Sequence, residues 1–289
     1  MCVVWVPRAS VHVGGLASLA RPSVIQGDAR GTIAAPPLVP LDPRAERKRA
    51  KDYRTLVNVL LPLAKAGSAS AQYEIASALH YCEQNLYAHF ISRATRAPKT
   101  NEEIRRNYEK LDDVAQQQFS ESYEDCHALL NDLDSLKSST DWLDRAAEAG
   151  YPPAIFAQAD LKLQTSVIKG DSAGIDQARQ SAIFASTSAD PEVLFGMATF
   201  VTGAGKTQTQ AAQLMSAWWL VGCERGYDCS AQSEWIQSNC IDPQCANKPT
   251  VVEELQRMNG AAFGEVQQLA DQINAAIDSR DREEIKKYL

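Results

Sequence analysis

The chain of 289 residues carries 29 basic and 36 acidic side chains, which gives a formal net charge of −7. Hydrophobic residues make up 45% and charged residues 22%, a balance that excludes a wholly disordered or collagen-like chain. An acidic protein is poorly suited to neutralising phosphates, so we expect no nucleic-acid partner. No run of about 18 apolar residues occurs, so we expect no integral membrane segment.

Residues 1–45 are predicted to be a disordered leader or linker. Six of the 13 prolines lie there, and proline removes a backbone donor and fixes φ, which favours an extended chain. The sequence VHVGGLASLA after Arg8 has small residues where a secretory cleavage site needs them. Its apolar run is short and contains His12. The remnant of an export signal and a start codon assigned at the wrong place both agree with this pattern.

From residue 46 onward the sequence predicts helices. Between Gly67 and Gly150 there is no glycine and one proline, and Ala, Leu, Glu, Gln and Arg dominate. This composition favours helix over strand. Apolar residues recur at helical spacing in 56–64 and in 252–277. Short segments rich in Gly, Pro, Ser and Asp, such as KAGSAS, EAGYPP and SADPE, separate the helical stretches. We therefore expect an all-α fold.

These separators keep a fixed distance from tryptophan and alanine residues. Trp142 stands eight residues before Gly150 and Ala154 stands four after it, and Trp218 stands eight before Gly226. In a two-helix unit, such a glycine ends the first helix in a left-handed cap, and small alanines let the helices approach closely.

Two further positions extend the pattern. Gly67 has Ala71 four residues later, and Asp190 takes the place of the glycine in a weaker copy, ASTSADPEVLFGMA. The anchors at 150, 190 and 226 are 40 and 36 residues apart, which is the period of two-helix solenoid repeats.

The motif W-x3-A-A-x2-G-x3-A, together with a G-x-G at residues 203–205, resembles the Sel1-like repeat family, a branch of the tetratricopeptide-like α/α solenoids. The motif residues are Trp142, Ala146, Ala147, Gly150 and Ala154, and Trp218 and Gly226 belong to the partial copy. The resemblance implies a right-handed solenoid of helix pairs that acts as an adaptor or scaffold. An irregular helical bundle with the same spacing is the alternative.

With this resemblance the chain divides into three parts. Residues 46–249 would form the repeat domain, with extra helices inserted at 83–140, where the G-x-G is missing. Residues 250–289 would form a C-terminal helical cap.

Six of the seven cysteines would remain after loss of a leader that contains Cys2. Four lie within 23 residues of a loop-rich stretch, where we expect cross-links in place of a core: Cys223, Cys229, Cys240 and Cys245. Three pairings of these four stay open, and Cys82 would pair with Cys126 across two helices. Three disulfides would indicate the bacterial periplasm or the exterior. The alternative is a cytoplasmic protein with reduced thiols.

Within the cluster of four cysteines, neither the C-x5-C nor the C-x4-C spacing is that of a zinc site. A second set near the first cysteine pair consists of His80, Cys82, His89, Cys126 and His127. Adjacent members of this set point in different directions on a helix, so we expect no metal site.

Three short motifs resemble those of enzymes but lack the required context. Residues 202–207 end like a phosphate-binding loop, but Phe200 stands where the first glycine belongs. Residues 170–174 match the G-x-S-x-G elbow, but all four histidines precede Ser172, which excludes the chain order of an α/β-hydrolase. Ser166 begins an S-x-x-K without its companion motifs, and we take it for a helix-surface residue. We therefore expect no catalytic site and no cofactor.

The charged residues suggest a solvated surface. The basic cluster, expected to be an exposed face of the first helix, consists of Arg44, Arg47, Lys48, Arg49, Lys51 and Arg54. The carboxylates considered for acid–base chemistry show no pair isolated from water: Glu102, Glu103, Asp112, Asp113, Asp132, Asp134 and Asp144.

Most of the aromatic side chains are expected in the core, including Trp235. Trp218 aligns with Trp142 and should face inward, which leaves Trp219 and Tyr227 as a candidate binding surface. The leading hypothesis is an interaction scaffold of the bacterial envelope that binds a protein or peptide on a concave solenoid surface. The alternatives are an immunity-type binder that neutralises a basic toxin, and a cell-wall or β-lactam-binding enzyme.

Overall fold

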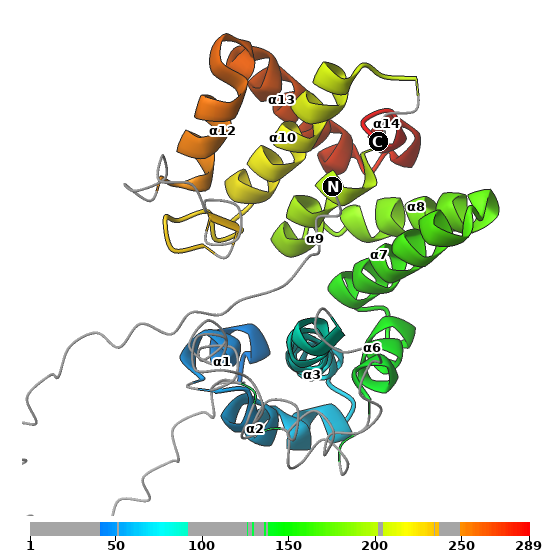
Figure 1. Cartoon of the computed structure of the whole chain (residues 1–289), viewed down its shortest axis with the longest axis vertical. Helices are drawn as coiled ribbons and strands as arrows, with labels where there is room; N and C mark the ends of the chain where they lie inside the picture. Colours follow the sequence, from blue (N-terminus) through cyan, green and yellow to red (C-terminus); the bar gives the residue numbers. More distant parts are fainter. Residues whose placement is uncertain are drawn as a thin grey trace, which may run out of the picture.

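The computed structural model describes residues 41–50, 52–91, 138–201, 205–233, 235–236 and 249–289, together with Cys126, Leu129 and Leu136. In 83–91 it describes the backbone alone. Every regular element in this part of the chain is a helix, and it contains no strand (Figure 1). The predicted all-α fold is therefore confirmed. None of the helices described is long and apolar enough to cross a bilayer.

The first helices form an N-terminal lobe. It consists of α1 (Pro43–Arg49), α2 (Tyr53–Lys65), α3 (Ala69–Ile91) and α6 (Ser139–Glu148), and it includes the start of α7 (Pro152–Lys169). The helices pack in chain order, α2 on α3, α3 on α6 and α6 on α7. Leu56, Leu60, Ile75, Leu79 and Trp142 are among the buried side chains that hold the lobe together.

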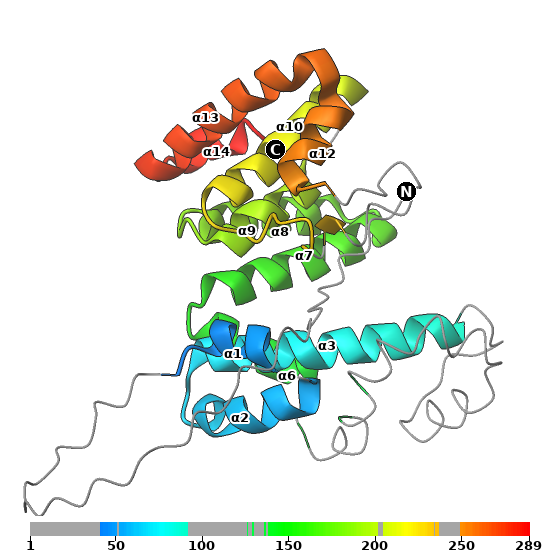
Figure 2. The ribbon, with the colours of Figure 1, turned by 90° about the vertical axis from the view of Figure 1, so that its left-hand side faces the viewer.

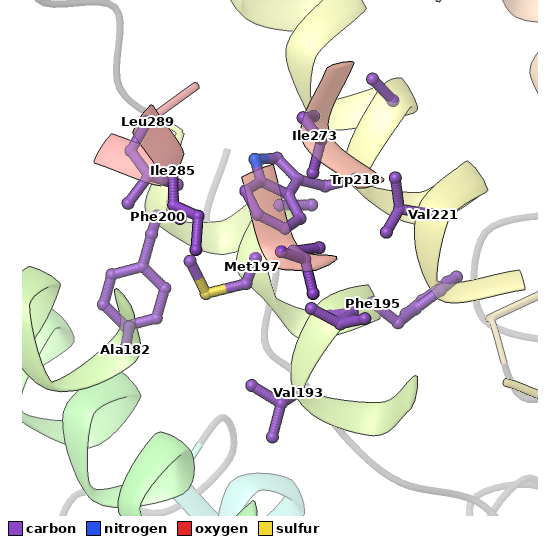
Figure 3. Close-up of a cluster of buried hydrophobic side chains, with 14 of the residues drawn as sticks. Ala182, Val193, Phe195, Met197, Phe200, Trp218, Val221, Ile273, Ile285 and Leu289 are labelled. Carbon is purple, nitrogen blue, oxygen red and sulfur yellow. The ribbon is translucent and has the colours of Figure 1, made fainter. Parts of the chain in front are cut away.

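The remaining helices form a C-terminal lobe around a second core. They are α8 (Ser172–Ser186), α9 (Pro191–Gly196), the 3₁₀ helix η2 (Met197–Phe200), α10 (Gln208–Glu224), α12 (Val251–Asn259), the 3₁₀ helix η4 (Gly260–Ala262), α13 (Phe263–Ser279) and α14 (Arg282–Lys286). Side chains from six of these elements meet around Met197 and Trp218 (Figure 3). The indole Nε1 of Trp218 donates a hydrogen bond to the carbonyl oxygen of Tyr288 at 3.0 Å.

Helix α7 belongs to both lobes. Ala154, Ala157 and Leu161 pack against the N-terminal core, whereas Phe156, Ala159 and Leu163 lie in the C-terminal core. Each set has the i, i+3, i+7 spacing of one helix face. The sets are two residues out of step, which places them about 200° apart around the helix. Helix α7 is therefore apolar on two opposite sides and joins the two lobes (Figure 2).

The same backbone cap follows α2, α6 and α10. Gly67, Gly150 and Gly226 have φ values of +96°, +79° and +102°. In each cap, the glycine amide donates to the carbonyl three residues earlier, and the next amide donates to the carbonyl five residues earlier. Around Gly150 these distances are 2.9 and 3.1 Å. This is the left-handed cap that the glycine spacing predicts.

The weaker copy of the pattern differs by one residue from its prediction. The residue with positive φ is Ala189, at +57°, and not Asp190. Asp190 instead caps α9, accepting hydrogen bonds from the amides of Glu192 at 3.0 Å and Val193 at 3.4 Å. An aspartate suits this position because its side chain satisfies backbone donors that the first turn of a helix leaves free.

The domain boundaries drawn from the sequence do not follow the division of the cores. Helix α1 begins at Pro43, inside the range of the predicted leader, and α12 to α14 share one core with α8 to α10. Helix α3 continues to Ile91, inside the predicted insertion. Most of 92–137, and the G-x-G at 203–205 except for Gly205, lie outside the described residues.

Two disulfides are present. Cys82 pairs with Cys126, the pairing expected from the sequence, and the two residues are 44 apart in the chain. Cys223 pairs with Cys229, 6 residues away, which selects among the pairings left open. Cys240 and Cys245 lie outside the described residues. In the chain-entropy description the first bond stabilises the fold by about 4 kcal/mol and the second by about 2 kcal/mol. Such bonds indicate an oxidising compartment, such as the periplasm or the exterior.

The close contact between α9 and α10 yields a test of the packing. A Cβ at Gly222 would lie 2.6 Å from the Cβ of Phe195 and 2.8 Å from its Cα. Gly222→Ala should therefore force the two helices apart and lower the free energy of unfolding by about 1–3 kcal/mol, measured by urea titration followed by circular dichroism. Gly264→Ala in α13, where a Cβ meets no atom within 4 Å, is the matched control and should gain up to about 1 kcal/mol. Equal effects of the two substitutions would contradict the packing.

The disulfides predict the number of free thiols. Four of the seven cysteines are in the two bonds, so at most three thiols should react with a thiol reagent in the denatured, unreduced protein. All seven should react after reduction. Mass spectrometry of the alkylated peptides would identify them, and alkylation of Cys82 before reduction would contradict the first bond.

Candidate functional site

A pocket opens where the two lobes meet. It is lined by α3 and α6 of the N-terminal lobe, by α9 and η2 of the C-terminal lobe, and by α7, which joins them. The pocket and the solvent space at its mouth together measure about 910 Å³. Its lining mixes apolar and polar side chains, among them Tyr73, His80, Thr140, Phe156, Asp160 and Glu192. A mixed lining of this kind is typical of a binding site.

Asp160 is the carboxylate that α7 contributes to the pocket. It lies one turn after Phe156, so the two side chains share a face of the helix. Its Oδ2 accepts a hydrogen bond from Gln164 Nε2 at 2.7 Å, and its Oδ1 accepts one from Thr199 Oγ1 at 3.2 Å. Burial raises the pKa of Asp160 above its ordinary value, while these hydrogen bonds and the charge of His80 act in the opposite direction.

Beside the pocket, α1 makes ion pairs with both lobes. Arg47 lies 3.3 Å from Glu74 of α3 and 4.0 Å from Glu192 of α9. Arg44 lies 2.8 Å from Asp190 and 3.5 Å from Glu192. We call these five residues the arginine cluster. Because it contains groups from α1, α3 and the start of α9, it fastens the lobes to each other at the pocket.

The arginine cluster corrects the interpretation of the basic residues as a solvated face. The side chain of Arg47 is 18% exposed and that of its partner Glu74 is 0% exposed. The carboxylates of the cluster are not among those considered in the sequence, and the side chain of Glu74 is shielded from water. Of the basic residues, Arg49 fits the expectation, since its side chain is 71% exposed.

Burial raises the pKa of Glu74, a member of the arginine cluster, and of Tyr73 beside it. The pKa of Glu74 rises to about 7 because burial penalises its charged form and Glu192 repels it, although Arg47 and Arg44 lower the pKa. Its Oε1 is buried without a hydrogen-bond partner. The pKa of Tyr73 is also raised, by burial and by Glu192 and Glu74. Tyr73 therefore stays protonated and donates a hydrogen bond from its hydroxyl to Glu192 Oε1 at 2.7 Å.

The aromatic residues predicted as a binding surface lie elsewhere. Trp219 and Tyr227 are half-buried and pack against the C-terminal core. Tyr227 stacks on Phe195 with ring centres 3.9 Å apart, and Trp219 meets Trp235 edge to face at 5.1 Å. Trp218, by contrast, has no exposed surface. None of these residues lines the pocket.

The residues of the other candidate motifs also have definite positions. Ser166 is 5% exposed, which corrects its assignment to the helix surface. It packs against Gly174, where a Cβ would lie 2.2 Å from the Ser166 hydroxyl. Gly170 ends α7 with φ +66°, and Asp171 caps α8 by accepting a hydrogen bond from Gly174 at 3.0 Å. The elbow motif is thus a helix–helix connection.

Two members of the His and Cys set considered as a metal site are unable to bind a metal as thiolates. Cys82 and Cys126 are joined in a disulfide and have no thiolate to offer. Among the residues that the structure describes, no three His, Cys, Asp or Glu side chains form a group suited to a metal ion. The side chain of His89, and all of His127, are outside the described residues.

Sequence reasoning missed Tyr73, Glu74, Asp160 and Glu192. One signal was available for Asp160, which follows the buried residues Phe156 and Ala159 along an otherwise apolar stretch of α7. An acidic residue at such a position needs a polar neighbour from elsewhere in the chain.

The chain matches none of the family models, none of the curated proteins and none of the solved structures with which it was compared. What this chain does is therefore inferred from its fold and its pocket.

The pKa of Glu74 predicts how stability depends on pH. The group binds its proton more tightly in the folded state, with a pKa of about 7 against an ordinary 4.5. Its contribution is therefore complete below about pH 4.5 and is lost as the pH rises through 7, on the order of 3 kcal/mol in all. Glu74→Gln should remove this part of the decline between pH 5 and pH 8, measured by urea unfolding.

The charged groups around Glu74 are Arg44 and Arg47 from α1 and Glu192 from α9, and they are retained in this variant. Glu148→Gln, which removes an exposed carboxylate from α6, serves as the control and should follow the wild-type profile. A Glu74→Gln profile parallel to that of the wild type would refute the assignment.

Proposed function

We propose that this chain is a protein-interaction scaffold that binds a protein or peptide partner in the pocket between its two lobes. The observation that carries the proposal is the pocket itself, which draws its lining from α3, α6, α7, α9 and η2. A site built from several helices that are far apart in the sequence is held in shape by the packing of both lobes. It therefore presents a preformed surface, which lowers the entropy cost of binding.

The scaffold that we propose is a right-handed α/α solenoid of Sel1-like helix pairs. Two features support it: the helices of the N-terminal lobe pack in chain order, and the caps at Gly67, Gly150 and Gly226 share one geometry. In such a fold each pair buries one face against its neighbours and leaves an inner surface for a partner. Under this proposal the pocket lies on that inner surface.

We place this function in the bacterial periplasm or outside the cell. The disulfides Cys82–Cys126 and Cys223–Cys229 support an oxidising compartment. The net charge of −7 favours a basic partner. An immunity-type binder that neutralises a basic toxin would share the fold and differ in the partner alone. Ser166, the candidate nucleophile of the enzyme alternative, is buried, which supports binding over catalysis.

A photocrosslinking amino acid would test the binding role. Thr140 is exposed and lines the pocket, whereas Ile168 is 86% exposed and lies outside it at the end of α7. In envelopes of the source cells, the photoreactive residue at position 140 should yield a discrete adduct with one partner. The same residue at position 168 should yield none.

A pocket-filling substitution completes the test. Ser77 lines the pocket and is half-buried, so Ser77→Trp should abolish the adduct from position 140. A thermal unfolding curve close to that of the wild type would show that the variant still folds. Adducts of equal yield from positions 140 and 168, or an adduct that Ser77→Trp leaves unchanged in the folded protein, would count against the proposal.

A further inference from the structure

The described lining of the pocket contains more acidic than basic side chains, and His80 is its one basic residue. The titratable side chains among its described lining residues are Tyr73, His80, Asp160 and Glu192, with no lysine or arginine. Two of the four are carboxylates. Glu192 already has cations close by, since Arg44 lies 3.5 Å from its Oε2 and Arg47 lies 4.0 Å from its Oε1. Asp160 is in a different situation.

The hydrogen-bond donors to Asp160 are both neutral. One is the amide of Gln164, which bonds Oδ2, and the other is the hydroxyl of Thr199, which shares its single proton between Oδ1 and the carbonyl oxygen of Gly196. A carboxylate oxygen has two acceptor positions, so both oxygens can accept a further hydrogen bond. Within the part of the chain that the structure describes, no lysine or arginine forms an ion pair with Asp160. An opposite charge within a few ångströms of a carboxylate stabilises its ionised form.

The walls around Asp160 suit an alkyl chain. Leu143, Phe156, Leu161 and Val193 line the same pocket, and the stems of lysine and arginine pack well on apolar side chains while the charged end meets a polar group. The ring of Phe156 shares a helix face with Asp160, so a cation there also lies near an aromatic surface. The described lining thus combines an apolar wall with a carboxylate that has His80 nearby but forms no ion pair with a lysine or arginine.

We infer that the pocket receives a lysine or arginine side chain of the partner, with Asp160 as its counter-ion. The inference rests on the proposed binding function and specifies the chemistry that the site recognises. The arginine cluster does not compete for this role, because its own carboxylates, Glu74, Asp190 and Glu192, are already paired with Arg44 and Arg47.

Single-residue probes would test the inference without knowledge of the partner. The full chain would be titrated with the N-methylamides of Nα-acetyl-arginine and Nα-acetyl-lysine, and with those of their uncharged analogues Nα-acetyl-citrulline and Nα-acetyl-norleucine, with binding followed by NMR chemical shifts. At least one cationic probe should bind about tenfold more tightly than its uncharged analogue. The cationic probe that binds more tightly shows whether the side chain of the partner is lysine or arginine.

A pair of variants assigns the effect to the residue. Asp160→Asn keeps the shape of the side chain and should remove the preference for the cationic probe. Asp176→Asn removes a carboxylate of α8 that is 70% exposed, and it should leave the preference unchanged. Equal binding of charged and uncharged probes, no binding of either cationic probe, or equal effects of the two substitutions would overturn the inference.

The outcomes also separate this inference from the proposed function. If position 140 yields its discrete adduct but the cationic probes show no preference, the role of Asp160 is overturned and the scaffold stands. If the cationic probes bind through Asp160 but position 140 yields no adduct, the role of Asp160 is supported and the scaffold is overturned.

Discussion

Helix α7 is the element on which the arrangement of this protein depends. A surface helix carries one apolar stripe, but α7 carries two, with Ala154, Ala157 and Leu161 on one side and Phe156, Ala159 and Leu163 on the other. Each stripe is buried by its own set of neighbours, so one lobe packs on each side of the helix. The pocket lies where these lobes meet, and α7 contributes Phe156 and Asp160 to it. The same constraint thus shapes the fold and the site.

The arginine cluster restrains the angle between the two lobes. An ion pair that is shielded from water is costly to form but strongly destabilising to break, because one charge then stays buried without a partner. Arg47 lies between Glu74 of one lobe and Glu192 of the other, so a change in the angle would separate charges. Tyr73 adds a hydrogen bond across the same gap. The cluster therefore favours one relative position of the lobes, which a preformed pocket requires.

The sequence predicted what local chemistry determines. Helical composition and the glycine spacing led to the all-α fold and to the caps at Gly67, Gly150 and Gly226, because a left-handed cap is set by a few consecutive residues. The fourth anchor was predicted at Asp190, but the residue with positive φ is Ala189. Alanine has no preference for a left-handed conformation, so no local feature marked this position. The pocket and the arginine cluster could not be predicted from the sequence. Arg44 and Asp190 are 146 residues apart, and no local pattern indicates that they meet.

The bond between Cys82 and Cys126 also affects how the molecule carries load. These residues are 44 positions apart, a stretch of chain that would measure about 150 Å at full extension. A pulling force applied to the two ends of the molecule passes directly through the sulfur atoms and bypasses everything between them. The enclosed segment therefore adds no extensible length under tension, and α3 stays covalently tethered to residue 126 even after the helices around it have separated.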